Sequence, residues 1–167
     1  MIKTFNSILV TMFGLGKIKF MPGTLGSLAT TVFLFYLFHP LNISSNIILI
    51  SLIIIFIYSF YAVSTHTESS KNKDPGEIII DEFLGQSIPI YLYEISHGTT
   101  KESDQAIVYY ALFFILFRYF DIMKPFPVNF FDKNFKNSFG VIMDDICAGL
   151  YVVLTVVCFM FIKSHVL

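Results

Sequence analysis

The segment FRYFDIMKPFPVNFFDKNFKNSFGVIMDDICAG, residues 117–149, joins two apolar stretches and decides how the rest of the chain is interpreted. One apolar run leads into it at 113–117, and a second leaves it at 146–162. Between them lie charged side chains that include Arg118, Asp121, Lys124, Asp132, Lys133, Asp144 and Asp145. Only 14% of the chain is charged, so this concentration beside two membrane-like stretches calls for a chemical explanation.

The composition of the chain is that of an integral membrane protein. Of the 167 residues, 55% are hydrophobic, and the mean hydropathy is +0.71, which exceeds that of ordinary soluble domains. No Asp, Glu, Lys or Arg occurs between Lys19 and Glu68. A helix of about 20 apolar residues crosses a bilayer core, so this interval has room for two spans. The net charge of −1 and the lack of a basic stripe predict no nucleic-acid partner.

The apolar runs predict a single all-α membrane domain over residues 1–167. It would be an integral membrane bundle of about four to five membrane-embedded helices, with an interfacial helix within residues 1–19. The embedded stretches are expected at 28–38, 46–63, 78–93, 106–120, and from 141 or 146 to 162. The stretch at 78–93 contains Pro89 and two acidic residues, so it is expected to be bent or to span only in part. Residues 94–105 are expected to form a polar loop, and His66 is expected to be solvated.

The basic residues set the expected orientation, because Lys and Arg concentrate on the cytoplasmic side of membrane proteins. Lysines precede the first span, whereas the connection at 39–46 contains no Lys or Arg. Alternation of the spans then places eight of the twelve acidic residues near the cytoplasmic face. These eight are Asp74, Glu77, Asp81, Glu82, Asp121, Asp132, Asp144 and Asp145.

Carboxylates crowded at a membrane boundary repel one another and stay ionised only when a cation compensates them. Oxygen ligands suit a hard divalent ion such as Mg²⁺, which commonly serves phosphate chemistry. Arg118 and Lys124 supply the complementary charges for phosphate oxygens. Asp144 and Asp145 are adjacent and point about 100° apart on a helix, so we expect them to have different roles.

Two further features bear on this site. Glu77 and Asp81 are separated by four residues, which would place them on one helical face. The Gly-rich segment at 23–27 would open the first span with free amides near Thr24 and Ser27, and free amides at a helix N-terminus attract anions. The alternative reading of this segment is a helix cap with close packing through the glycines.

Other interpretations remain open at this point. The charged residues can be ordinary ion pairs at helix ends. A cation-coupled transporter would use membrane carboxylates, but it would spread them through the bilayer and show internal repeats, and the chain shows neither pattern. A different phospholipid phosphomonoesterase or phosphotransferase is a closer alternative, although no His lies in a motif.

Three blocks of the sequence resemble the bacterial phosphatidylglycerophosphatase A family of membrane lipid phosphatases. They are MPGTLGS at 21–27, DPGEIIIDEFLG at 74–85, and FRYFDIMKPFP at 117–127 continuing to FDK at 131–133 and GVIMDDICAG at 140–149. The blocks cover residues 20–150. The resemblance implies Mg²⁺-dependent removal of the terminal phosphate of phosphatidylglycerophosphate in the bilayer, which gives phosphatidylglycerol. Attack by water and formation of a phospho-aspartate both remain open.

The resemblance also implies roles for individual residues. The catalytic residues would be Asp81, Glu82, Asp121, Lys124 and Asp145. The substrate-binding residues would be Arg118, Lys124, Thr24, Ser27 and Lys133. The metal ligands would come from Asp81, Glu82, Asp121, Asp144, Asp145 and Glu77, with Asp74 and Asp132 nearby. The expected location is the bacterial inner membrane, with the site facing the cytoplasm, and no obligate protein partner is inferred.

Overall fold

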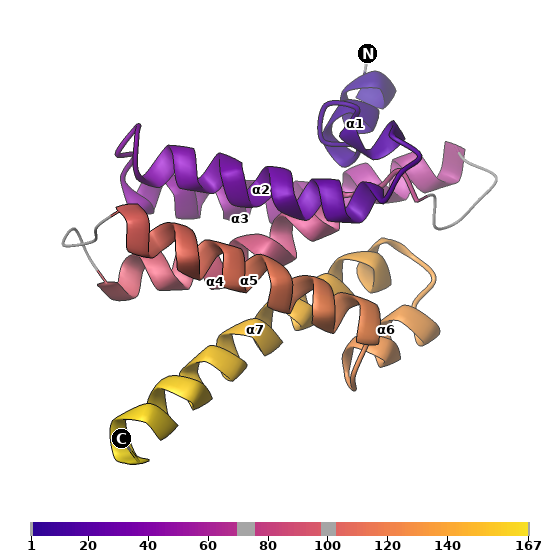
Figure 1. Ribbon diagram of the computed structural model, residues 1–167. Coiled ribbons are helices and arrows are strands. Elements are labelled where there is room, and N and C mark those ends of the chain that lie inside the picture. The colour runs from indigo at the N-terminus through magenta and orange to yellow at the C-terminus, as the bar shows by residue number, and fades with distance from the viewer. Residues whose placement is uncertain (1, 70–75, 98–102, 167) are drawn as a thin grey trace.

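The structure is a computed structural model that describes residues 2–69, 76–97 and 103–166, and within these ranges it consists of helices and loops. Figure 1 shows the elements in chain order. They are α1 (Ile2–Val10), a short 3₁₀ turn η1 (Leu15–Lys17), α2 (Pro22–Phe38), α3 (Ser45–Ser69), α4 (Ile80–His97), α5 (Ser103–Met123), α6 (Val128–Asn134) and α7 (Ser138–Val166). The expected all-α class is therefore confirmed.

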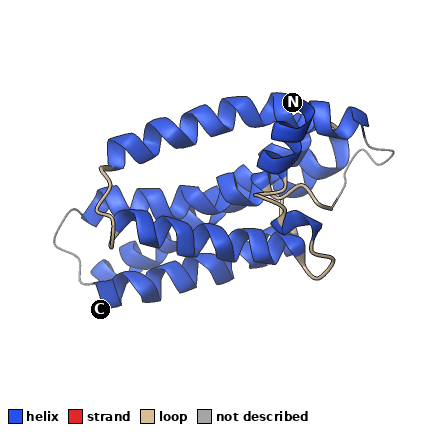
Figure 2. Ribbon diagram, turned by 90° about the horizontal axis from the view of Figure 1, so that it is seen from above, coloured by secondary structure: helices blue, strands red, loops and turns tan. Residues whose placement is uncertain are grey.

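The longer helices form a bundle, and the short helices α1 and α6 lie at one of its ends (Figures 1 and 2). The same end holds the starts of α2, α4 and α7 and the finish of α5. The C-terminus of α7 lies at the opposite end. This arrangement matters because the described residues of the three charged blocks lie at the first end.

Helix α4 is the centre of the bundle and packs against α2, α3, α5 and α7. Its buried apolar side chains include Phe83, Leu84, Ile90 and Tyr93, and most positions from 83 to 90 are buried. A helix that is buried on most of its faces lies in the interior of a bundle. Polar residues Asp81, Gln86, Ser87 and Glu94 are buried on the same helix, so α4 brings polar groups into an otherwise apolar interior.

Two glycines allow α4 and α7 to approach closely. A Cβ atom added at Gly85 would lie 2.4 Å from the backbone oxygen of Asp145, and one added at Gly149 would lie 2.2 Å from the backbone oxygen of Gly85. Neither distance is compatible with a side chain. Small residues at helix crossings are common in membrane proteins because they let the backbones come together. This crossing fixes the position of the acidic pair in α7 relative to the start of α4.

Three helices are long and apolar enough to cross a membrane, over Ser45–Glu68, Asp104–Met123 and Ser138–Ser164. Helix α2 is a shorter apolar helix, with 17 residues. Helix α4 contains Pro89, as the sequence indicated, and its 18 residues reach about 27 Å at 1.5 Å per residue, slightly less than a bilayer core. Within the described residues, the bundle thus combines three helices long enough to span a membrane with two shorter ones.

Two local expectations are wrong. Residues 94–97 continue α4 instead of starting a loop, and Glu94 is buried, because the Tyr110 hydroxyl donates to its carboxylate over 3.1 Å. The imidazole of His39 lies 3.5 Å from the same carboxylate. His66 is not simply solvated, since its Nε2 atom lies 2.9 Å from Glu77 Oε1. Partners distant in sequence explain both differences.

Replacing Gly85 by Ala is expected to destabilise the bundle by about 1–3 kcal/mol, the usual cost of overpacking, because the added methyl group meets backbone atoms of α7. The measurement is thermal unfolding of the purified protein in detergent. Gly76→Ala is the control, since nothing lies within 4 Å of a Cβ at that position. Equal unfolding temperatures for the two variants would contradict the proposed role of the crossing.

Candidate active site

A cavity of about 480 Å³ opens at the charged end of the bundle. Helices α2, α4, α5 and α7 contribute to its walls, together with α6 and the loop that follows it. The cavity lining includes apolar side chains such as Met21 and Ile122, and more than half of the surface of each is exposed. The polar side chains of the lining are Thr24, Asp81, Glu82, Arg118, Asp121, Lys124, Asp132, Lys136, Asp144 and Asp145.

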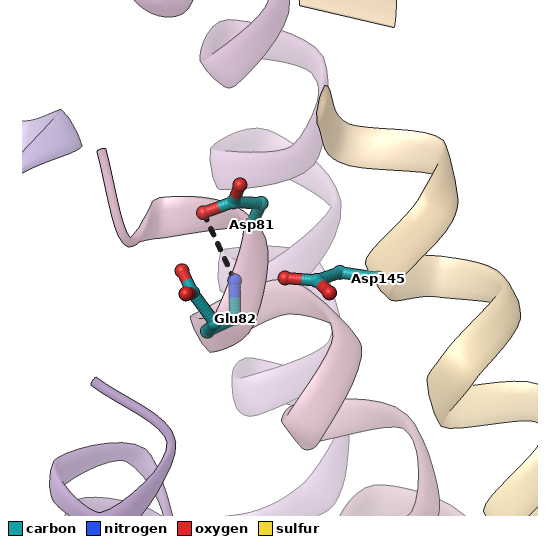
Figure 3. A group of neighbouring side chains, drawn as sticks. All are labelled: Asp81, Glu82 and Asp145. Atoms are coloured by element: carbon teal, nitrogen blue, oxygen red, sulfur yellow. Dashed lines mark hydrogen bonds between the residues drawn. The ribbon is translucent and has the colours of Figure 1, made fainter. Parts of the chain in front are cut away.

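Three carboxylates meet in this cavity, from Asp81 and Glu82 in the first turn of α4 and from Asp145 in α7 (Figure 3). One oxygen of each lies within 4.8 Å of the others. Asp81 and Asp145 are buried, and the Glu82 Oε2 atom is buried without a hydrogen-bond partner. Three oxygen donors at this spacing, one of them unpartnered, fit a hard divalent cation. The donor chemistry therefore agrees with Mg²⁺.

Local geometry holds this group in place. The backbone N–H of Glu82 donates to Asp81 Oδ1 over 3.1 Å, which orients the Asp81 carboxylate (Figure 3). On the α2 side, a Cβ atom at Gly23 would lie 2.2 Å from Glu82 Oε1, so a larger residue there would displace that carboxylate from its observed position. The glycine in the first sequence block thus has a packing role at the cavity wall.

Asp144 and Asp145 point to different partners. Asp144 Oδ2 accepts from Lys124 Nζ over 3.1 Å, and its Oδ1 atom accepts from the backbone N–H of Asp145. Asp145 joins Asp81 and Glu82 instead. Both aspartates are expected cation ligands, and of the two only Asp145 belongs to the three-carboxylate group among the described residues.

Lys124 links three helices at the cavity rim. Helix α5 ends at Met123, and Lys124 adopts a left-handed backbone conformation with φ of 44° before Pro125. Its ammonium lies 2.8 Å from Asp132 Oδ1 in α6 and 3.1 Å from Asp144 Oδ2 in α7. Burial opposes the charge, but the bonds to these two carboxylates outweigh it and raise the pKa of Lys124. The hydrogen bond from Lys124 lowers the pKa of Asp132.

Arg118 supplies the second positive group. Its Nη1 atom lies 2.8 Å from Asp121 Oδ2, one helical turn further along α5, and 3.4 Å from Ser27 Oγ in α2. These two contacts hold the guanidinium at the cavity wall. The buried Nε atom of Arg118 has no partner among the described residues.

Most of the residues singled out in the sequence line the cavity, but three of the described ones do not. Ser27 is fully buried behind Arg118, and its hydroxyl donates to Gly23 O. Lys133 is exposed and does not belong to the lining. Glu77 lies in the turn before α4, where it contacts His66, and not on a shared helical face with Asp81. Asp74 lies outside the described residues.

Two residues of the site region were not predicted to belong to it. Lys136 lines the cavity from the loop between α6 and α7, and its basic character on the expected cytoplasmic face was the available signal. Gln86 does not line the cavity but is buried one turn after Glu82, and the polar pair Gln86 and Ser87 within the apolar part of 78–93 was its signal.

Comparisons with known proteins agree with the charged blocks. The family model described as "Phosphatidylglycerophosphatase A" matches residues 8–160. A phosphatidylglycerophosphatase A of Haemophilus influenzae is 36% identical over 149 residues, which cover 89% of this chain and 85% of the relative. A protein of Bacteroides thetaiotaomicron named "Putative phosphatidylinositol-3-phosphatase" is 32% identical, with 89% of each chain covered.

The phosphatidylglycerophosphatase A of Escherichia coli is 29% identical over 144 residues, which cover 86% of this chain and 76% of the relative. No solved structure matches the chain.

A divalent cation should stabilise the folded protein, because a ligand that binds only the folded state adds about 2.7 kcal/mol at a hundred times its Kd. The expected result is a rise in unfolding temperature with added Mg²⁺ or Mn²⁺, which Asp145→Asn removes. Asp104→Asn, at an exposed carboxylate on α5, should keep the rise. An equal rise in both variants would place the cation elsewhere.

Proposed function

Because the chain belongs to the phosphatidylglycerophosphatase A family, we propose that this phosphatase hydrolyses phosphatidylglycerophosphate to phosphatidylglycerol and inorganic phosphate with Mg²⁺. The observation that carries the proposal is the meeting of three carboxylates with Arg118 and Lys124 in one cavity. This is the charge arrangement that phosphate-monoester hydrolysis needs, since positioning and charge neutralisation supply most of its catalysis.

Asp81, Glu82 and Asp145 would hold the cation. Bound there, Mg²⁺ would act as a Lewis acid and neutralise charge that develops on the phosphate oxygens. The three carboxylates come from two helices whose crossing is fixed by Gly85 and Gly149, so their spacing does not depend on a loop. A rigid arrangement of this kind preserves the geometry that catalysis requires.

Arg118 and Lys124 would bind the phosphate oxygens that the cation leaves free. Asp121 fixes the guanidinium of Arg118, and Asp132 and Asp144 fix the ammonium of Lys124. The raised pKa of Lys124 keeps it charged at neutral pH, so it serves as a fixed positive charge and not as a proton donor. Thr24 and Lys136 stand at the same cavity wall and would contact the remaining headgroup atoms.

The apolar surroundings favour a lipid substrate. Met21 is 53% exposed and Ile122 is 65% exposed, and both line the cavity. Exposed apolar side chains beside a polar cavity would let the headgroup enter while the acyl chains stay in the bilayer. A phosphoinositide is the second candidate substrate, because one relative carries the name of a phosphatidylinositol-3-phosphatase and both substrates are lipid phosphate monoesters.

The cavity is proposed to face the cytoplasm of a bacterial inner membrane. Lys17 and Lys19 precede α2, and Lys124 and Lys136 line the cavity at the same end of the bundle. An excess of Lys and Arg is typical of cytoplasmic segments.

The purified protein should release phosphate from phosphatidylglycerophosphate in the presence of Mg²⁺, and EDTA should abolish the release. Asp81→Asn and Asp145→Asn should each lower kcat/KM by about a hundredfold or more, since each removes one charged ligand. Asp104→Asn is the matched control and should be unaffected. Phosphatidic acid, phosphatidylinositol 3-phosphate and a soluble phosphate ester are compared in the same assay. Faster release from any of these would reject the proposed substrate.

Orientation is testable by cysteine labelling in bacterial cells. Lys136→Cys, in a chain whose Cys147 and Cys158 are replaced by Ser, should react with a membrane-impermeant maleimide only after the cells are opened. Asn42→Cys, in the loop between α2 and α3, should react in cells whose outer membrane is permeabilised. The reverse pattern would overturn the cytoplasmic orientation.

A further inference from the structure

Gln86 is the least explained polar side chain of the bundle. It is 0% exposed on α4, and neither its Nε2 nor its Oε1 atom has a hydrogen-bond partner in the described part of the chain. Leaving a buried polar group unpaired costs about 1–3 kcal/mol. A leucine of similar size would avoid this cost, so packing alone does not account for glutamine at this position.

Two other unpartnered polar atoms belong to the same region. They are Glu82 Oε2 and Arg118 Nε, and both are buried. Glu82 and Gln86 are four residues apart on α4, so their side chains are neighbours on one helical face. A Cβ atom at Gly23 would lie 2.2 Å from Glu82 Oε1 and 3.3 Å from Arg118 Nη1, which places the carboxylate and the guanidinium beside the same α2 residue.

The hydrogen-bonding capacities of these three groups are complementary. A carboxylate oxygen only accepts, a guanidinium Nε only donates, and an amide does both. Arg118 Nη1 reaches Ser27, one turn beyond Gly23 on α2, and Gln86 lies one turn beyond Glu82 on α4. Because α2 and α4 start at the same end of the bundle, we infer that the amide and the guanidinium lie at a similar depth.

We propose that Gln86 is a positioning residue of the cation site, whose amide N–H donates to Glu82 Oε2 and whose amide oxygen accepts from Arg118 Nε when cation and phosphate occupy the cavity. This inference rests on the proposed function. With Oε2 bonded to the amide, Glu82 Oε1 is available to bind the cation. The amide oxygen also holds the guanidinium in the direction of the phosphate. One side chain thereby connects the cation ligands to the phosphate-binding group.

The test compares Gln86→Leu with Ser87→Ala, which removes a neighbouring buried hydroxyl that already donates to Phe83 O. Calorimetric titration with Mn²⁺ should show a 10- to 100-fold weaker affinity for Gln86→Leu, as is usual when the partner of a metal ligand is lost. Without cation, the same variant should unfold at a temperature equal to or above that of the wild type, because the unpaired amide is gone. Ser87→Ala should bind Mn²⁺ like the wild type.

A merely structural role would lower the stability of Gln86→Leu and leave its Mn²⁺ affinity unchanged, and that result would overturn the inference. Phosphate release separates this outcome from failure of the proposed function. A wild type that neither binds Mn²⁺ nor hydrolyses phosphatidylglycerophosphate overturns both proposals. A wild type that does both, matched by Gln86→Leu in affinity and in kcat/KM, overturns only the role of Gln86.

Discussion

The mutual repulsion of buried carboxylates is the constraint on which the site depends. Asp81, Glu82 and Asp145 offer oxygens within 4.8 Å of one another in a chain that is otherwise strongly apolar. Such a group is unfavourable unless positive charge compensates it, and the nearest fixed cations are already engaged by Asp121, Asp132 and Asp144. The bundle must therefore hold these residues together against their repulsion, and close helix packing at glycine residues does this. Gly85 and Gly149 let α4 and α7 cross at backbone contact, and Gly23 leaves space for Glu82.

Helix geometry separates the carboxylates proposed to bind the cation from the groups proposed to bind phosphate. Adjacent residues on a helix point about 100° apart, so Asp144 and Asp145 can reach different partners. Asp144 accepts a hydrogen bond from Lys124, whereas Asp145 lies beside the carboxylates of α4. Lys124 can reach both α6 and α7 because α5 ends immediately before it, ahead of Pro125. The short helix α6 thereby becomes part of the cavity wall.

The sequence was sufficient for the helical class, the membrane character and most cavity residues, because long apolar runs and charges within them are strong local signals. It was insufficient where a residue's partner comes from a distant segment. Glu94 was assigned to a loop because only its polarity is visible in the sequence, whereas Tyr110 stabilises it inside the bundle. Glu77 was assigned to the site by its spacing from Asp81, but α4 starts later, at Ile80, and His66 takes Glu77 away from the cavity. Ser27 and Lys133 were expected to line the cavity and do not, because the direction of a side chain depends on the packing of its helix.

The balance of charge in the cavity lining implies an order of events. The described lining residues supply six carboxylates and three cationic groups. The carboxylates belong to Asp81, Glu82, Asp121, Asp132, Asp144 and Asp145, and the cationic groups to Arg118, Lys124 and Lys136. With these groups ionised, the cavity is a negatively charged chamber that repels a phosphate dianion. A divalent cation that enters first removes most of this repulsion. The phosphate headgroup would therefore bind after the cation. The same excess of negative charge would keep free inorganic phosphate from accumulating in the cavity before a cation binds.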